Sequence, residues 1–418
     1  MDLSIEQSCP SCGAPIELHE TDRLLKCPFC DMGNYLASAG ISRFVLPDKA
    51  PPSIAREDLF YMPYFRFKGN VFSCQGVQVE HKVIDTTHVG AEAPLLPLSL
   101  GLRPQAMKIL PVTERICGKF FKQTDKISTV FTKASMLAGM ISSNQPMVSP
   151  YHRAFIGETV SCIYLPLYLQ SGSLYDAVVN RPLGKGDALA GMMPQAAGYQ
   201  PEWSPRFLAT VCPHCAGTLT GEHDSLVLSC TTCESLWTVQ DGAFQQVSWQ
   251  LLKSGRGEDN CRYLPFWRIS PTVEGVRLAH FGDLLRLTNQ PVVVTGEHDS
   301  LELSFWAPAF KIRPNFFLQL ARSMTLSQGR IPAGGQEMAG TMYPVTLPSS
   351  EALQATKTIL ADLTLDKRHF LPHLPSIAVR SQQTDLIYLP FHSSGRDLIQ
   401  EQTSISVASV VLDFGRGL

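Results

Sequence analysis

The segments Cys9-Pro-Ser-Cys12 and Cys27-Pro-Phe-Cys30, with fourteen residues between them, decide how the chain begins to fold. The same spacing returns 203 residues later in Cys212-Pro-His-Cys215 and Cys230-Thr-Thr-Cys233. Each C-x-x-C turn presents two sulfurs, and fourteen residues suffice for a hairpin that folds one turn over the other. The pattern predicts two metal sites, one formed by Cys9, Cys12, Cys27 and Cys30 and the other by Cys212, Cys215, Cys230 and Cys233.

Structural zinc is the ion that this ligand set favours. Four thiolates close the tetrahedral shell, whereas catalytic zinc keeps one position open for water. Rubredoxin-type iron favours glycine directly after the second cysteine of each turn, and only Gly13 meets that preference, against Asp31, Ala216 and Glu234. A redox-active dithiol is the third alternative and fits no better. We expect two structural zinc ions per chain, each contributing roughly 10–16 kcal/mol to a hairpin with little core of its own.

The cysteine turns resemble those of the zinc-ribbon superfamily. Cys9-Pro-Ser-Cys-Gly13, Cys27-Pro-Phe-Cys30 and Cys212-Pro-His-Cys215 match its C-P-x-C knuckles, and Cys230-Thr-Thr-Cys233 lacks the proline. A ribbon followed by a Y-x-P-F-W strand is also similar to bacterial zinc-ribbon proteins. The resemblance implies a fold element at the head of each half of the chain.

The rest of the chain repeats as well. Tyr61-Met-Pro-Tyr-Phe-Arg66 returns as Tyr263-Leu-Pro-Phe-Trp-Arg268 at an offset of 202, and Ile163-Tyr-Leu-Pro-Leu167 returns as Ile387-Tyr-Leu-Pro-Phe391 at an offset of 224. Gly101-Leu-Arg-Pro104 pairs with Lys311-Ile-Arg-Pro314 at an offset of 210, so the second half has gained insertions. Repetition of several motifs in one order indicates a duplication.

The predicted fold class is α+β and β-rich, with two tandem halves, each a four-cysteine ribbon followed by an antiparallel β body with one or two helices. We expect each Y-x-P strand to enter a hairpin, with turns in Phe67-Lys-Gly-Asn-Val71 and Phe391-His-Ser-Ser-Gly-Arg396. The strand prolines should lie at an edge or near a strand start. Ser349 and Ser350 should cap a helix over 351–361, with a counterpart near 133–141.

Composition shifts predict five segments. They are ribbon 1 (1–46), body 1 (54–193), a linker with three prolines (194–205), ribbon 2 (206–243) and body 2 (244–418).

The overall composition is that of a globular protein. The 35 basic and 37 acidic residues leave no excess of positive charge for gripping phosphates. Residues 1–10 contain two acids and no base before any apolar stretch, so a secretory leader is not expected, and no apolar window approaches the length of a membrane span. Paired C-x-x-C cysteines suit reduced thiols, which favours the cytoplasm.

Other candidate residues are explained more simply by architecture. The segment Gly221-Glu-His-Asp-Ser225 recurs as Gly296-Glu-His-Asp-Ser300, and we expect a turn, with His298 and Asp299 as the less certain pair. The repeated arginines Arg66, Arg103, Arg268 and Arg313 could bind an anion, but pairing with a buried carboxylate or an aromatic ring in the same half is favoured. His369 and His373 have the spacing of helical metal ligands, yet Pro372 argues against a helix there.

No catalytic signature is found, so the favoured function is a non-enzymatic adaptor or scaffold that binds other proteins. The first alternative is nucleic-acid binding. It is disfavoured by net charges of -4 over residues 1–36 and -2 over residues 206–240, although Lys119, Lys122, Lys126 and Lys133 could form a basic groove. The second alternative is an enzyme with a site between the halves, which requires polar side chains to converge there.

Overall fold

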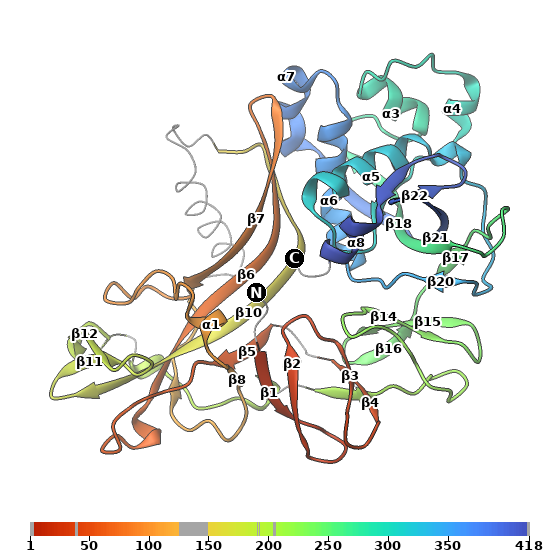
Figure 1. Cartoon of the computed structure of the whole chain (residues 1–418). Helices are drawn as coiled ribbons and strands as arrows, with labels where there is room; N and C mark the ends of the chain where they lie inside the picture. Colours follow the sequence, from red (N-terminus) through yellow and green to blue (C-terminus); the bar gives the residue numbers. More distant parts are fainter. Residues whose placement is uncertain are drawn as a thin grey trace.

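The computed structural model describes residues 4–37, 41–124, 149–189, 191, 193–203 and 206–415. It confirms a strand-rich α+β fold with two similar curled β-sheet bodies, each preceded by a four-cysteine cluster (Figure 1). Body 1 lies at the left of Figure 1 and body 2 at the upper right, and the two ribbons lie side by side below body 2.

The ribbons are built from short antiparallel strands. In ribbon 1, β1 (Ser4–Ser8) pairs with β2 (Pro15–His19), and β3 (Leu24–Lys26) pairs with β4 (Gly33–Leu36). In ribbon 2, β14 (Val227–Cys230), β15 (Ser235–Gln240) and β16 (Ala243–Gln246) form one sheet. Its remaining strand, β13 (Phe207–Ala209), instead pairs with β4 of ribbon 1.

The two bodies have the same strand topology. Body 1 contains β5 (Ser42–Val45), β6 (Phe60–Gln75), β7 (Gln78–Val89), β8 (Leu110–Pro111), β9 (Lys119–Phe120), β10 (His152–Gln170), β11 (Ser173–Asp176) and β12 (Arg181–Lys185). Body 2 contains β17 (Trp249–Leu251), β18 (Cys261–Glu274), β19 (Phe305–Pro308), β20 (Thr341–Met342), β21 (Ala378–Ser394), β22 (Asp397–Gln400) and β23 (Ser406–Ala408). In body 1, β6 pairs antiparallel with β10, while β5 and β9 join them in parallel. In body 2, β18, β21, β17 and β20 repeat this arrangement.

Strand register confirms the duplication at the level of single residues. Tyr164 lies opposite Pro63 in the pairing of β10 with β6, and Tyr388 lies opposite Pro265 in the pairing of β21 with β18. A β-bulge follows at the same place in each pair, between Ile156 and Thr159 in body 1 and beside Pro271 in body 2. Because a slip of one residue would reverse every side chain, this shared register identifies the two bodies as copies of one unit.

One predicted turn is wrong. Instead of turning at Lys68-Gly-Asn, β6 continues to Gln75 and turns at Gly76. Gly69 lies opposite the bulge of β10, where a Cβ atom would approach the Cα of Glu158 to 2.9 Å. This glycine therefore serves close backbone approach rather than a turn. The other predicted turn is confirmed, because Gly395 (φ 64°) joins β21 to β22.

Helices are concentrated in body 2. The described helices are α1 (Arg103–Ala106), α3 (Phe281–Leu287), α4 (Gly296–Ser300), α5 (Pro314–Leu326), α6 (Ser349–Leu363), α7 (Lys367–Phe370) and α8 (Ser409–Gly415). The predicted helix over 351–361 is α6, which begins at Ser349 after Pro348, so neither serine provides the cap. Its expected counterpart near 133–141 lies outside the described residues. The insertion in the second half includes α3 and α4, which separate β18 from β19, so β18 does not enter the expected hairpin.

Body 1 has apolar clusters of its own, and part of it also joins the apolar core of body 2. Phe72, Cys74, Ala154 and Ile156 of body 1 belong to the same buried cluster as the core of body 2, and the ring centroids of Phe72 and Phe317 lie 5.9 Å apart. Val227 and Leu236 extend this cluster into ribbon 2. In Figure 1 the curled β6, β7 and β10 correspondingly reach up beside the helices of body 2. Body 1 thus completes the interior of body 2 instead of standing apart from it.

Candidate metal centres

The eight paired cysteines form two compact clusters. Cys9, Cys12, Cys27 and Cys30 make one and Cys212, Cys215, Cys230 and Cys233 the other, with the sulfur atoms of each within 4.8 Å of one another. The Sγ atoms of Cys9 and Cys30 are 3.9 Å apart and those of Cys12 and Cys27 are 3.7 Å apart. Zn–S bonds of about 2.3 Å in a tetrahedron place sulfurs about 3.8 Å from each other. Each cluster therefore fits one metal ion with this geometry.

All four knuckles share one backbone conformation. The residue after the second cysteine has a positive φ at Gly13 (76°), Asp31 (59°), Ala216 (60°) and Glu234 (51°). The amide of Gly13 donates to the carbonyl of Cys9 at 2.8 Å, and Ala216 donates likewise to Cys212 at 2.9 Å. Three of these knuckles hold a residue other than glycine in the left-handed region, at a cost of about 1–2 kcal/mol each. Glycine content at this position consequently says nothing against iron, and a four-thiol donor set fits either zinc or iron.

The thiols of each cluster cannot all ionise in the absence of a cation. Burial raises the pKa of Cys9, but the amides of Cys12 and Ser11 and the neighbouring thiols outweigh it and lower the pKa to about 6. The amide of Ala14 lowers the pKa of Cys12, but burial and the three other thiols raise it to about 12. Since one thiolate suppresses ionisation of the next, a divalent cation is what allows the full set to be charged.

Three of the four repeated arginines form structural ion pairs, as expected. Arg66 is completely buried and donates to Glu20 of ribbon 1 and, through Nε and Nη2, to both oxygens of Asp85 at 2.9 Å. Arg268 pairs with Asp385 at 2.9 Å. Arg103, the Arg-Pro residue of the first half, pairs with Asp176. Arg313 is exposed and forms no ion pair with a described residue, so the expectation is not met there.

The repeated Gly-Glu-His-Asp-Ser segment adopts two different structures. The first copy turns between the knuckles of ribbon 2 and leads into β14, as predicted. The second copy is the short helix α4, so the prediction of a turn is wrong there. Asp299 accepts two hydrogen bonds from Arg286 at 2.6 and 2.7 Å, and the ring of His298 accepts from the Thr295 amide. In the second copy, the arginine of α3 and the threonine cap hold the segment in a helical conformation. In the first copy, the metal-binding knuckles on either side hold it in a turn.

His369 and His373 do not form a metal site with any other described residue. His369 lies in α7 and contacts Asp366 through Nδ1 at 2.7 Å, while His373 follows in a 3₁₀ segment, Leu371–Ser376. Both side chains are exposed. As predicted, the α-helix ends before Pro372.

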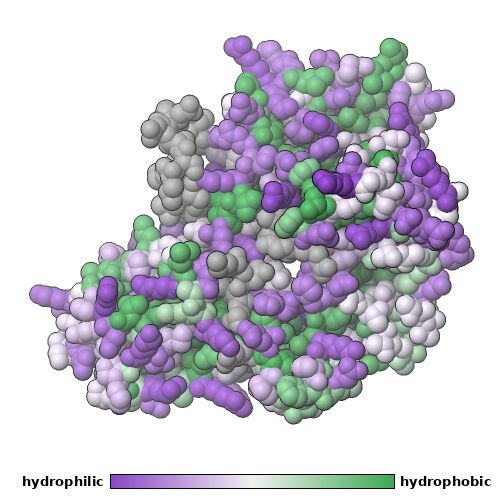
Figure 2. All heavy atoms as spheres, in the orientation of Figure 1, coloured by the Kyte–Doolittle hydropathy of each residue, from purple (hydrophilic) through white to green (hydrophobic). Residues whose placement is uncertain are grey.

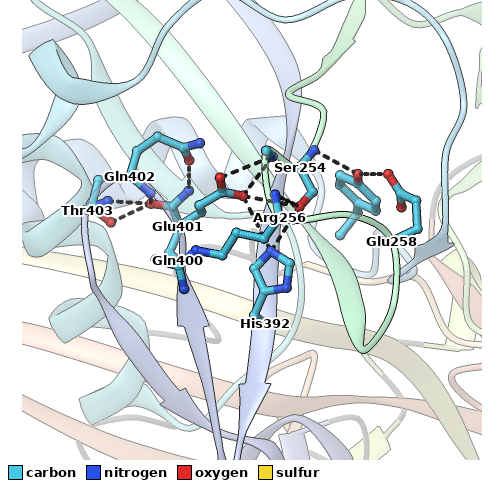
Figure 3. A network of polar contacts seen from close by, with 10 residues as sticks. Ser254, Arg256, Glu258, His392, Gln400, Glu401, Gln402 and Thr403 are labelled. Carbon is cyan, nitrogen blue, oxygen red and sulfur yellow. Dashed lines mark hydrogen bonds and ion pairs between the residues drawn. The ribbon is translucent and has the colours of Figure 1, made fainter.

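A polar network in body 2 could not be found from the sequence (Figure 3). Ser254 Oγ lies 3.0 Å from His392 Nε2 and donates to Glu401 Oε2 at 3.2 Å. In a catalytic triad, the serine hydroxyl is hydrogen-bonded to one nitrogen of the histidine ring and the carboxylate to the other nitrogen. Here Glu401 also lies on Nε2, at 3.4 Å, so the three groups form a closed triangle and not a relay. The network instead ties the loop at Ser254 to β21 and the end of β22.

A small cavity of about 140 Å³ lies where the ribbons and bodies meet. Ribbon 1 contributes Arg23, ribbon 2 Asp224, body 1 Glu158, and body 2 Lys311 and Glu351. Lys311 Nζ donates to the Thr159 hydroxyl at 3.1 Å, and the Glu351 carboxylate accepts from the amides of Gly157 and Glu158 in the bulge. Polar groups thus converge between the halves, and nothing in the local sequence identifies them as neighbours.

Comparison with known proteins adds no assignment to these centres. No family model, curated protein or solved structure matches the chain. None of the described helices is long and apolar enough to cross a membrane.

Proposed function

We propose that this protein is a non-enzymatic, zinc-stabilised adaptor of the cytoplasm, in which two zinc ions hold the ribbons in shape and ribbon 1 presents a docking surface to another protein. Zinc ions bound by Cys9, Cys12, Cys27 and Cys30 and by Cys212, Cys215, Cys230 and Cys233 are supported by the compact four-thiol clusters. None of the twelve cysteines forms a disulfide, which suits a reducing compartment.

The observation that supports docking is an exposed apolar pair on the second knuckle of ribbon 1. Phe29 is 67% exposed and Met32 is 50% exposed, beside the Lys26–Asp31 ion pair. The equivalent positions of ribbon 2, at an offset of 203, hold Thr232 and Ser235 instead. Aromatic and methionine side chains are enriched in protein interfaces, whereas threonine is not. Figure 2 shows pale and apolar residues over the ribbons, below the more hydrophilic surface of body 2.

Ion pairs change the net charge of ribbon 1 only slightly. Glu20 is bound by Arg66 of body 1, and Asp31 by Lys26 at 3.1 Å. Lys26 is already included in the net charge of -4, so Arg66 alone offsets that charge further. The acidic ribbon and the absence of a basic excess in the whole chain both count against nucleic acid.

The test is site-specific photo-crosslinking in the native cell. A photoreactive amino acid in place of Phe29 should capture a protein, and the same residue in place of Thr232 is the matched control on the other ribbon. Phe29→Asp should reduce recovery of that protein at least about tenfold, as removal of a central apolar contact does. Equal capture from both positions would remove the support for this surface. A salt-sensitive gel shift that is lost in Lys119→Glu/Lys122→Glu would favour nucleic acid instead; Lys126 and Lys133 lie outside the described residues.

A further inference from the structure

The two ribbons are joined through their backbones. β4, which follows the second knuckle of ribbon 1, is the central strand of a three-stranded sheet between β3 and β13. Leu208 lies opposite Tyr35, and the pairing extends beyond the strands because Ala37 donates to the Arg206 carbonyl at 2.8 Å and Thr210 to the Gly33 carbonyl at 3.3 Å. Two residues after Thr210 comes Cys212, the first ligand of ribbon 2. One sheet therefore runs from the knuckle of one metal cluster to the knuckle of the other.

The packing across this sheet is equally shared. Tyr35 of ribbon 1 is only 4% exposed and lies in one apolar cluster with Cys212, Cys230, Leu228 and Trp237 of ribbon 2. A side chain from one ribbon thus helps to form the core around two ligands of the other.

Close approach at the sheet depends on a glycine. A Cβ atom at Gly33 would lie 2.4 Å from the Thr210 hydroxyl, so the absence of a side chain there allows the two strands to meet. A side chain at this position would force the Thr210 hydroxyl to move.

A second contact joins the segments that connect the two cysteine turns of each ribbon. The amides of Arg23 and Leu24 both donate to the His223 carbonyl, at 2.6 and 2.8 Å, and the His223 ring contacts Asp22 at 2.7 Å. His223 lies in the turn that ribbon 2 forms with its first Gly-Glu-His-Asp-Ser copy. The ribbons are thus held at two places, by the pairing of β4 with β13 and by the contact of Arg23 and Leu24 with His223.

We infer that the two metal sites are energetically coupled, so that loss of the ion from one ribbon weakens retention of the ion in the other. An emptied ribbon loses the hairpin that its cysteines hold. If ribbon 1 opens, β13 loses its partner strand and the core around Cys212 and Cys230 loses Tyr35. If ribbon 2 opens, β4 loses β13. Coupling between two binding sites is reciprocal and commonly amounts to about 5–150-fold in affinity.

Coupling would make the docking surface at Phe29 dependent on both ions. This consequence rests on the proposed function, but the coupling of the two metal sites does not. The intact chain, loaded with cadmium so that its two thiolate sites give separate NMR resonances, allows each site to be followed during challenge with a chelator. No partner protein is needed, so failure of the coupling and failure of the docking surface are separately visible.

The decisive variant is Tyr35→Ala, which leaves all eight cysteines in place. Although Tyr35 belongs to ribbon 1, this change should accelerate metal loss from ribbon 2 at least about fivefold. His19→Ala, which removes an exposed ring of the same ribbon outside the cysteine turns, is the matched control and should leave that rate unchanged. Cys12→Ser, which empties ribbon 1 at an exposed ligand, should accelerate loss from ribbon 2 by a similar or larger factor.

Release from ribbon 2 at the wild-type rate in both Tyr35→Ala and Cys12→Ser would overturn the inference. Should Cys12→Ser fail to fold, Tyr35→Ala alone decides, because amide hydrogen exchange of residues 207–240 can be compared with that of the His19→Ala protein. Equal exchange in the two variants would also count against coupling.

Discussion

Asp385 lies directly opposite Arg268 across β18 and β21, and the two side chains form an ion pair at 2.9 Å. In body 1 the residue opposite Arg66 is Ser161, whose hydroxyl donates instead to Glu20 at 2.8 Å. Arg268 therefore obtains its carboxylate from the facing strand, whereas Arg66 obtains one from the other neighbouring strand, as Asp85 of β7, and a second from its ribbon, as Glu20. The second carboxylate connects ribbon 1 to body 1.

Glu20→Gln should consequently destabilise the protein. The substitution leaves Arg66 completely buried with Asp85 as its remaining charged partner, so we expect a loss of about 1–3 kcal/mol in the free energy of unfolding. Denaturant titration measures it. Asp31→Asn removes an exposed ion pair of the same ribbon and should change stability by less than about 1 kcal/mol. Equal effects of the two changes would contradict the structural role of Glu20.

Metal removal should unfold the ribbons and leave much of the body structure intact. We expect elemental analysis to find two zinc ions per chain, and a strong chelator to abolish hydrogen-exchange protection over residues 9–30 and 212–233. The strands β18 and β21 should stay protected, since they lie in the large apolar core. One ion per chain, or the visible absorption of an iron–thiolate centre, would refute the assignment.

Raising the pH from about 5 to about 8 should weaken the contact between body 1 and α6. Burial, together with the charge of Glu158, raises the pKa of Glu351 to about 8, against the opposing effects of Lys311 and the bulge amides. Burial raises the pKa of Glu158 to about 7. Both carboxyls keep a proton in the folded chain at a pH where the unfolded chain has lost it. The free energy of unfolding therefore falls as the pH rises from the ordinary value of 4.5 through these raised values.

Glu351→Gln should flatten this dependence, because glutamine does not titrate. Thermal unfolding across the same pH range provides the measurement, and an effect on the order of 1–3 kcal/mol is expected. Glu337→Gln, which removes an exposed partner of Lys253, is the control and should keep the wild-type slope. Burial lowers the pKa of Lys311. This shift makes the free energy of unfolding rise with pH below the ordinary lysine value of 10.5, opposite to the effect of the carboxyls. The acid side of the range therefore reports the carboxyls more clearly. Identical slopes for wild type and Glu351→Gln would show that this carboxyl ionises freely.

Gly69→Ala should destabilise body 1 by about 1–3 kcal/mol, because the new Cβ would press against the backbone of Glu158 at 2.9 Å. Gly198→Ala meets nothing within 4 Å and should be close to neutral. Chemical denaturation of the two variants compares them directly. A neutral Gly69→Ala would mean that the bulge can shift at little cost.

The sequence predicts most accurately those features that repeat or that chemistry constrains. The cysteine spacing locates both metal clusters, and the matching offsets predict that Pro63 is equivalent to Pro265, which the strand register confirms. Local patterns are weaker evidence. The sequence Gly-Glu-His-Asp-Ser forms a turn in ribbon 2 and the helix α4 in body 2. The two copies differ because each contacts a different partner elsewhere in the chain, Asp22 for the first copy and Arg286 for the second.

Contacts between distant segments escape the sequence altogether. Ser254 meets Glu401 across 147 residues, and Gly157 meets Glu351 across 194, without any motif that marks either pair. Loops and bulges bring these groups together, and their positions depend on how the whole chain packs.

The apolar residues that body 1 contributes to the core of body 2 have a consequence for synthesis of the chain. While the ribosome is still adding residues beyond β12, Phe72 and Ile156 have no α5 or α6 to cover them, and the outer edge of β4 has no β13 beside it. The nascent first half therefore emerges with an uncovered apolar hairpin and an open strand edge, the two features that most readily recruit chaperones or other nascent chains. Completion of the second half covers both, so this exposure is confined to the time before body 2 and ribbon 2 have folded.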